Sequence, residues 1–291
     1  MLTVHFEADD PMQLRVMTKH DIPGGVRLNT VVGWNQTEAD WSRFLAASPN
    51  GCFAMEDGGK IVGTAATLPF ENKFAWISMV LVDPNYRNQG IGTSLLRRAI
   101  DHLDSTGIPT LKLDATPAGK PLYEKLGFVT EYEIDRWILK RTVTDTSSQH
   151  AIEAAERLSE VLEFDQEVFG ADRGALLRSL NERAPDLTLI DQDANRLAGY
   201  VFGRRGLFAD HLGPWMALNA EAARSLLAEF LQRSSRDTII VDALRSNQIA
   251  GNLLRENGFS PARLLTRMYR GPNSFPGKPD FPCAIMGPEF G

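Results

Sequence analysis

The feature that most constrains the fold is an internal repeat in this chain of 291 residues. Residues 113–137 recur as residues 241–268, and a shift of 131 positions carries Phe128 onto Phe259. Three further matches support the repeat: Arg136 with Arg267, residues 94–96 with residues 225–227, and DGGKIVG (57–63) with DANRLAG (193–199). Because one chance match is easy and four in order are not, the two halves are predicted to be copies of one fold.

A polar stretch separates the two copies. The residues TVTDTSSQH, beginning at Thr142, are small and polar and show no periodicity, as in a linker. We therefore predict a first domain at 1–142, a linker at 143–149 and a second domain at 150–291. With 43% hydrophobic and 23% charged residues, the chain has enough apolar side chains to bury sizeable cores.

The charge balance and the two cysteines argue against several classes of function. A net charge of −6 offers no broad cationic face, so we expect no nucleic-acid partner. Cys52 and Cys283 lie far apart and neither belongs to a C-x-x-C pair, so we expect no disulfide framework and no metal site. No window supplies the ~20 apolar residues of a membrane span. The sequence thus predicts a cytoplasmic protein without a membrane partner, and it leaves the oligomeric state open.

Apolar periodicity in the first half alternates between strands and helices. A hairpin is expected at Asp57, Gly58 and Gly59, which tolerate the positive φ of a tight turn. The other predicted elements are strands at 13–17, 75–82 and 110–115, helices at 90–105 and 119–127, and a last pair of strands within 130–141. This order predicts a mixed α/β fold.

The segment RNQGIG, residues 87–92, follows a buried strand and an Asp83-Pro84 turn and opens a helix. The first turn of a helix has unpaired N–H groups and a partial positive charge, both of which an anion satisfies. Glycine lacks a Cβ and lets a phosphate approach closely, so a pyrophosphate is the predicted ligand. A kinase-type P-loop would need Lys after Gly92, and a dinucleotide fingerprint would need Gly in place of Leu95.

The segment matches the pattern Q/R-x-x-G-x-G/A, and over residues 13–140 the chain resembles the GNAT superfamily of acyl-CoA-dependent N-acetyltransferases. The resemblance implies that each half is a twisted, mostly antiparallel mixed sheet flanked by helices. It also implies acetyl-CoA as acyl donor, with its pantetheine arm paired to the backbone of the preceding strand. The cofactor-binding residues implied are Val80, Leu81, Val82, Arg87, Asn88, Gln89, Gly90, Ile91, Gly92 and Thr93.

Tyr123, in PLYEKLGF, matches the tyrosine that in this family protonates the departing coenzyme A thiolate. A phenol with a pKa near 10 is suited to that task, although tyrosines pack on sheets more often than they catalyse. An amide near Val80 is the simplest donor to the oxyanion. The general base stays open: a water chain, or one of His20, Glu38, Asp40, Glu131 and Glu133.

The segment GWNQTEADW, residues 33–41, falls where GNAT enzymes place the helices of the acceptor groove. Trp34 and Asn35, with Trp41 and Gln36, are candidates for the groove wall. The alternative is that the two tryptophans pin this segment to the core. The acceptor is expected to be a primary amine of a small molecule or a peptide, which attacks the thioester carbonyl of acetyl-CoA directly, without a covalent enzyme intermediate.

The second copy has lost the residues that the first site needs. Glu221 and Ala223 stand where the first copy has Gly90 and Gly92. A carboxylate there would repel a pyrophosphate, so this domain is predicted to be degenerate and to cover, shape or regulate the first. In its other segments, Arg173 is expected in a surface ion pair, Arg204 and Arg205 in solvent, and residues 271–291 as an extended tail on a surface.

Two rivals to the enzyme remain at this point. The first is a non-catalytic acyl-CoA-binding sensor, and the second is an interaction module with a vestigial loop. Tyr123 favours the enzyme, because neither rival needs an acid at that place.

Overall fold

The computed structural model describes residues 12–143, 157–194 and 196–291. The chain forms two compact units: Met1–Leu68 with Met79–Thr106, and Pro69–Ser78 with Gly107–Gly291. These are called unit 1 and unit 2. The domain boundary predicted at 142–150 falls inside unit 2, and residues 144–149 of the predicted linker lie outside the described residues. The domain limits therefore stay a prediction.

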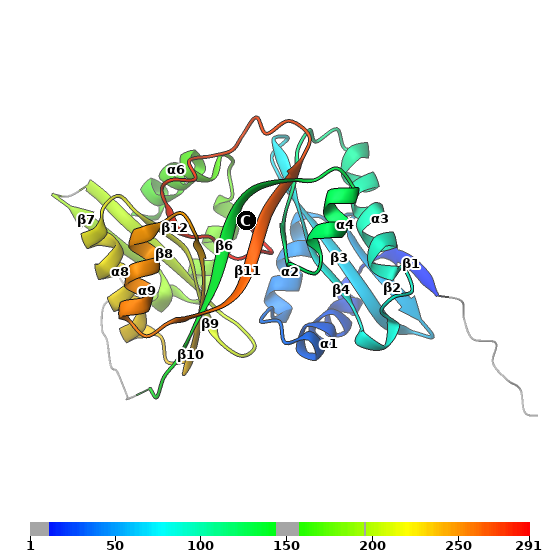
Figure 1. Ribbon diagram of the computed structural model, residues 1–291, viewed down its shortest axis with the longest axis horizontal. Helices are drawn as coiled ribbons and strands as arrows, with labels where there is room; N and C mark the ends of the chain where they lie inside the picture. The colour runs from blue at the N-terminus through cyan, green and yellow to red at the C-terminus, as the bar shows by residue number, and fades with distance from the viewer. Residues whose placement is uncertain (1–11, 144–156, 195) are drawn as a thin grey trace, which may run out of the picture. The chain divides into compact units, whose positions relative to one another are not determined.

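Unit 1 is an antiparallel sheet with helices. Strand β1 pairs with β2, and β2 pairs with β3 through the hairpin at Gly58 and Gly59, whose φ angles are 53° and 77°. Helix α3 buries Ile91, Leu95 and Leu103 at helical spacing. The elements are β1 (Gln13–Val16), η1 (Lys19–Asp21), α1 (Ile22–Val32), α2 (Glu38–Ala47), β2 (Cys52–Asp57), β3 (Lys60–Phe70), the end of β4 (Phe74–Val82), η2 (Pro84–Tyr86) and α3 (Ile91–Ser105) (Figure 1).

Unit 2 holds the end of β3, the start of β4 and the described elements from β5 onward. Strands β7, β8 and β9 form an antiparallel meander, and β4 pairs with β5 in parallel. The elements are β5 (Leu111–Ala115), α4 (Lys120–Lys125), β6 (Val129–Lys140), α6 (Leu158–Phe169), α7 (Gly174–Arg183), η3 (Pro185–Leu187), β7 (Leu189–Asp193), β8 (Arg196–Arg205), β9 (Asp210–Ala217), α8 (Ala220–Arg233), β10 (Thr238–Leu244), α9 (Gln248–Glu256), β11 (Ser260–Arg270) and β12 (Pro282–Ala284).

The two copies exchange their long strands within unit 2. Strand β11, from the second copy, pairs with β5 of the first, with Met268 opposite Leu113. Strand β6, from the first copy, pairs with β10 of the second, with Trp137 opposite Val241. The two exchanged strands also pair with each other and lie side by side in Figure 1. The last strand pair predicted within 130–141 is therefore wrong: these residues contain no turn, and they form one strand whose partners come from the other copy.

A buried ion pair accompanies each exchanged strand. Arg136 on β6 donates two hydrogen bonds of 2.7 Å to Asp242 on β10. Arg267 on β11 donates two of 2.9 Å to Asp114 on β5. The repeat aligns Arg136 with Arg267, and the LDA segment of β5 with the VDA segment of β10, so the two pairs are equivalent. Burial raises the pKa of Asp242, but Arg136 and His211 lower it by more, and the net pKa lies well below the usual range.

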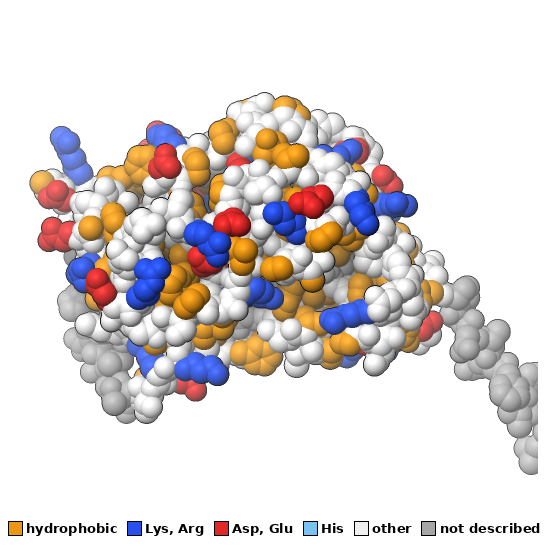
Figure 2. All heavy atoms as spheres, viewed as in Figure 1, with side chains coloured by type: hydrophobic (Ala, Val, Ile, Leu, Met, Phe, Trp, Pro, Cys, Tyr) orange, Lys and Arg blue, Asp and Glu red, His pale blue; other side chains and the backbone are white. Residues whose placement is uncertain are grey.

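Two arginines that were expected at the surface are buried, and so is the end of the tail. Arg173 donates bonds of 2.9 and 2.8 Å to Asp165, and Arg204 forms an ion pair with Glu289. Residues 282–291 are buried except for half-buried Pro288. These expectations were wrong because the tail folds back, so that Glu289 pairs with Arg204 and the Gly291 carbonyl accepts a hydrogen bond of 2.9 Å from Arg173. Figure 2 shows cationic and anionic side chains interspersed on one face of the described residues.

Candidate active site

The glycine turn lies in unit 1 at the start of α3. Asn88 and Gly90 adopt left-handed backbone, with φ of 65° and 79°, and Gly90 is the N-cap residue. Ser94 N–H donates to the Gly90 carbonyl at 3.0 Å. Within the described part of the chain, the N–H groups of residues 88–93 donate to no protein acceptor. The turn therefore offers a run of backbone donors at the positive end of a 15-residue helix.

The side chains of the turn leave these donors accessible. Residues 87–90 are exposed, Ile91 is buried, and Gly92 and Thr93 are half-buried. A Cβ built on Gly92 would meet only Val82 Cγ2, at an ordinary 3.5 Å. The packing of the protein thus does not require glycine at position 92, whereas close approach of a ligand would. This is the fit expected for a pyrophosphate.

Asp83 anchors the turn, a role that sequence reasoning missed. It is buried and accepts hydrogen bonds from Asn85 N–H and from Arg27, both at 3.1 Å, and an ion pair from Lys60 at 3.2 Å. Burial raises the pKa of Asp83, but these donors lower it by more, so it stays ionised at neutral pH. In the sequence, an aspartate between a strand and a proline predicts only the end of the strand.

The strand before the turn contains a kink. Met79 in β4 is buried and has a φ of 52°, unusual for a residue with a side chain. Its carbonyl accepts a hydrogen bond of 2.9 Å from the Thr64 hydroxyl. The kink directly precedes Val80, Leu81 and Val82, whose backbone the sequence predicts to pair with the pantetheine arm.

Tyr123 belongs to unit 2 and lies on α4. Its ring is half-buried, in an edge contact of 6.1 Å with Phe128, and a Cβ on Gly119 would come within 3.0 Å of it. Burial raises the pKa of the phenol to about 12. Within the described residues, its hydroxyl makes no hydrogen bond. The side chain is thus held by its ring, and its proton is retained through neutral pH.

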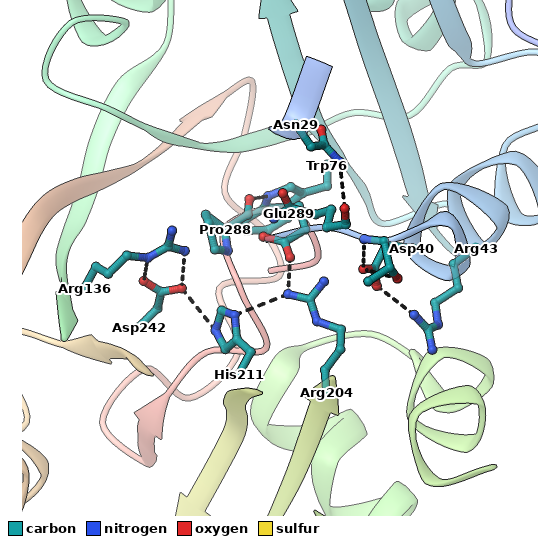
Figure 3. A network of polar contacts seen from close by, with 12 residues as sticks. Asn29, Asp40, Arg43, Trp76, Arg136, Arg204, His211, Asp242, Pro288 and Glu289 are labelled. Carbon is teal, nitrogen blue, oxygen red and sulfur yellow. Dashed lines mark hydrogen bonds and ion pairs between the residues drawn. The ribbon is translucent and has the colours of Figure 1, made fainter. Parts of the chain in front are cut away.

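Three of the five candidate bases form ion pairs with basic side chains. Asp40 accepts from Arg43 at 2.7 Å (Figure 3), Glu131 from Lys112 at 3.2 Å and Glu133 from Arg245 at 2.7 Å. The other two, His20 and Glu38, are exposed.

The acceptor-groove candidates divide between core and surface. Trp41 is fully buried, and a Cβ on Gly25 would lie 2.6 Å from its indole. Trp41 is therefore a core residue, as the alternative interpretation holds. Trp34 is half-buried after α1, and Asn35 is buried. Their part in an acceptor groove stays a prediction.

The second copy closes the corresponding helix start with its own side chain. Asn219 caps α8 by accepting a hydrogen bond of 2.8 Å from Ala222 N–H. Glu221 follows in the first turn, and Leu254, at the position of Tyr123, is fully buried. The Asn219 side-chain oxygen and the Glu221 carboxylate thus lie at the start of α8, whereas the N–H groups of residues 88–93 at the start of α3 donate to no described protein acceptor.

Two kinds of feature are absent from the described residues. Among the described residues, no group of three or more His, Cys, Asp or Glu side chains is placed to hold a metal ion. No helix in the described ranges combines the length and apolarity needed to cross a bilayer.

Comparisons with known proteins match both copies. The "Acetyltransferase (GNAT) family" matches residues 27–128, and the "Acetyltransferase (GNAT) domain" matches residues 161–280. The holothin acyltransferase of Pseudoalteromonas sp. (strain SANK 73390) is 26% identical over 240 residues, covering 82% of this chain and 81% of that protein. The [ribosomal protein bS18]-alanine N-acetyltransferase of Escherichia coli (strain K12) is 36% identical over 95 residues, 30% of this chain and 64% of that protein.

The fold of the whole chain has a solved counterpart. The crystal structure of a putative acetyltransferase from Pyrococcus horikoshii superposes with a TM-score of 0.78 at 23% identity, covering 99% of this chain and 98% of that one. The predicted fold class is confirmed, and so is the tandem arrangement of two GNAT copies. The chain belongs to the GNAT acetyltransferase family.

Proposed function

We propose that the chain is an N-acetyltransferase that uses acetyl-CoA and transfers the acetyl group directly to a primary amine. The observation that carries this proposal is the open start of α3, where the N–H groups of residues 88–93 have no protein acceptor. Such a helix end binds a pyrophosphate, and the second copy shows how the same fold looks when the end is closed by Asn219.

The proposed roles of the residues follow from their chemistry. Bound acetyl-CoA would supply an activated acyl group. The amides of residues 88–93 hold its pyrophosphate with the Arg87 side chain beside them, and the backbone of Val80, Leu81 and Val82 holds its pantetheine arm. An N–H near Val80 donates to the carbonyl oxygen, which becomes negative as the amine attacks. Tyr123 gives its phenolic proton to the departing thiolate.

The acceptor is proposed only as a class. The matched Escherichia coli protein acts, by its name, on an alanine nitrogen of a ribosomal protein, and a glucosamine 6-phosphate N-acetyltransferase of Trypanosoma brucei brucei is 36% identical over 83 residues. Both names support a primary amine as the nucleophile. We propose an amine of a small molecule or a peptide, bound on the side of Trp34 and Asn35.

Thermal unfolding with and without acetyl-CoA tests the proposal. A ligand at about 100 times its Kd adds about 2.7 kcal/mol of stability, which should raise the Tm by roughly 5–10 °C. Gly90→Glu, which copies Glu221 of the second copy, should abolish this shift. Gly58→Glu is the matched control, because Gly58 also has positive φ and open space at its Cβ but lies in the β2–β3 hairpin.

Two results of the thermal unfolding experiment would contradict the proposal in different ways. No shift in the wild-type chain would refute acetyl-CoA binding, and an equal shift in Gly90→Glu would place the binding elsewhere. Thiol release across a panel of amines then separates an enzyme from a sensor that binds acyl-CoA without turnover. The hydroxyl of Tyr123, which makes no hydrogen bond to the described residues, favours the enzyme.

A further inference from the structure

In each copy two parallel strands pair only at their beginnings. In the first copy, β4 and β5 pair over Ala75 with Leu111 and Trp76 with Lys112, although β4 continues to Val82. In the second copy, β9 and β10 hold the equivalent places and pair from Asp210–Ile239 to Leu212–Val241. Both strands continue beyond that point, to Ala217 and Leu244. Past these residues, the described part of the chain shows no further pairing of β4 with β5 or of β9 with β10.

In the second copy the chain itself supplies a further strand. Strand β12 lies between β9 and β10 in the order of the sheet. Ala284 stands opposite Trp215 of β9 and opposite Ala243 of β10, and both pairings are antiparallel. Ile285 N–H then donates to the Asp242 carbonyl at 3.0 Å. The later halves of both strands thus have a backbone partner inside the molecule.

We infer that residues 282–285 occupy, in the second copy, the place that the pantetheine arm of acyl-CoA takes in the first, so that the chain binds one acyl-CoA and not two. This inference rests on the proposed function for the first copy. A pantetheine arm carries amide groups and can pair with a strand as a peptide does, so a short peptide strand is a chemical equivalent. In the second copy, residues 282–285 then take the place of the pantetheine arm.

The residues around the 282–285 segment are fitted to it. A Cβ on Gly213 would lie 2.0 Å from the Ile285 carbonyl oxygen, so only glycine lets the segment approach β9 so closely. Asn247 donates to the Pro282 carbonyl at 3.1 Å, besides capping α9. Cys283, Ala284 and Ile285 are 2%, 0% and 4% exposed. Residues 283–285 are therefore part of the buried core.

The residues that follow hold the segment in place. Trp76 Nε1 donates to the Pro288 carbonyl at 3.0 Å, and Glu289 forms a buried ion pair with Arg204. Arg204 also contacts His211 Nδ1 at 3.3 Å, and His211 Nε2 lies 3.2 Å from Asp242 (Figure 3). Because an arginine only donates, Nδ1 must accept, which places the proton of a neutral His211 on Nε2, facing Asp242. This buried chain connects the 282–291 stretch to the ion pair of the exchanged strand.

Thiol labelling tests whether the segment stays in place. In a Cys52→Ala chain, Cys283 is the single thiol, because the sequence has two cysteines. We expect its reaction with a disulfide reagent to be at least 100-fold slower in the native chain than in urea. Labelling at the unfolded rate would overturn the inference.

Paired variants test the fit. Gly213→Ala, which clashes with Ile285, should speed the labelling of Cys283 by about tenfold or more, whereas Gly251→Ala, whose Cβ would meet only the Arg255 side chain at 3.7 Å, should not. If Gly213→Ala does not fold, Asn247→Asp keeps the cap of α9 but loses the donor to Pro282, and Asn219→Asp is its control. Equal labelling in a variant and its control would overturn the inference.

Counting bound coenzyme A completes the test. Titration calorimetry should give one equivalent for the wild-type chain and none for Gly90→Glu. Two equivalents, or one that Gly90→Glu retains, would place coenzyme A in the second copy and overturn the inference. No binding by the wild-type chain would refute the proposed function of the first copy, and the labelling of Cys283 would then decide this inference alone.

Discussion

Replacing Tyr123 by phenylalanine removes the phenolic oxygen and with it the acidic O–H, and the structure indicates what should follow. The ring is held by Phe128 and Gly119, and phenylalanine keeps both contacts. The hydroxyl has no hydrogen-bond partner among the described residues, so its loss leaves no protein group unpaired. The free energy of unfolding should change by less than about 0.5 kcal/mol. A general acid, by contrast, contributes about 10²–10⁴-fold to a rate, or about 3–5 kcal/mol of transition-state stabilisation.

The assay is thiol release at saturating donor and acceptor, beside a direct measurement of coenzyme A binding. Tyr123→Phe should keep the Kd for coenzyme A and lower kcat by about 10²-fold or more. An unchanged kcat would refute the acid role and leave Tyr123 with a packing role only. A raised Kd with unchanged kcat would instead make Tyr123 part of the binding surface.

The pH dependence gives the same experiment a second readout. Since burial raises the pKa of Tyr123 to about 12, the phenol keeps its proton at every pH below about 11. Its acid form is present in this whole range and is lost only as the pH rises through the folded pKa. The ratio of wild-type to Tyr123→Phe rates should therefore stay constant between pH 8 and pH 10. A ratio that collapses near pH 10 would contradict the desolvation of the phenol.

Three further predictions concern stability and the acceptor. Arg267→Met leaves Asp114 as a buried, unpaired carboxylate and should lower the free energy of unfolding in urea by about 3–5 kcal/mol. Arg245→Met, in an exposed pair, should lower it by at most about 1 kcal/mol. Equal losses would contradict the burial argument. Trp41→Ala should cost about 3–5 kcal/mol, while Trp34→Ala should raise the KM of the acceptor at little cost in stability; an unchanged KM across an amine panel would remove Trp34 from the groove. The low pKa of Asp242 contributes stability that is present above the unfolded pKa of about 3.9 and is lost as the pH falls below it, so acid unfolding should be steeper in the wild-type chain than in Asp242→Asn.

Local elements could be predicted from the sequence because local rules determine them. The hairpin at Gly58 and the helix after Gly90 both form as their residues indicate. The open amides of the turn follow from the same rules, since a helix that begins at a glycine has no side chain with which to close its end.

The exchange of strands could not be predicted in this way. Strand β6 has the same pattern whether it pairs with its own copy or with the other, because both copies present equivalent edges. The buried arginines were missed for the same reason: Arg136 and Arg267 align in the repeat, but nothing local shows that each meets the aspartate of the opposite copy. The partner of Arg204, Glu289, lies 85 residues along the chain; Arg173 pairs with the nearby Asp165 but also donates to the carbonyl of Gly291, 118 residues away.

The exchange also explains why a copy without a site would be retained. Strand β5 of the first copy has β11 of the second as its antiparallel neighbour, and β5 is the strand beside the start of β4. Without the second copy, β5 would lose this partner, and Asp114 would lose Arg267 and become a buried, unpaired charge. The second copy can therefore lose its glycine turn, and residues 282–285 can pair with β9 and β10, without destabilising the first copy. Deleting the second copy, by contrast, would destabilise the first. Its contribution to the fold of the first copy does not depend on binding acyl-CoA.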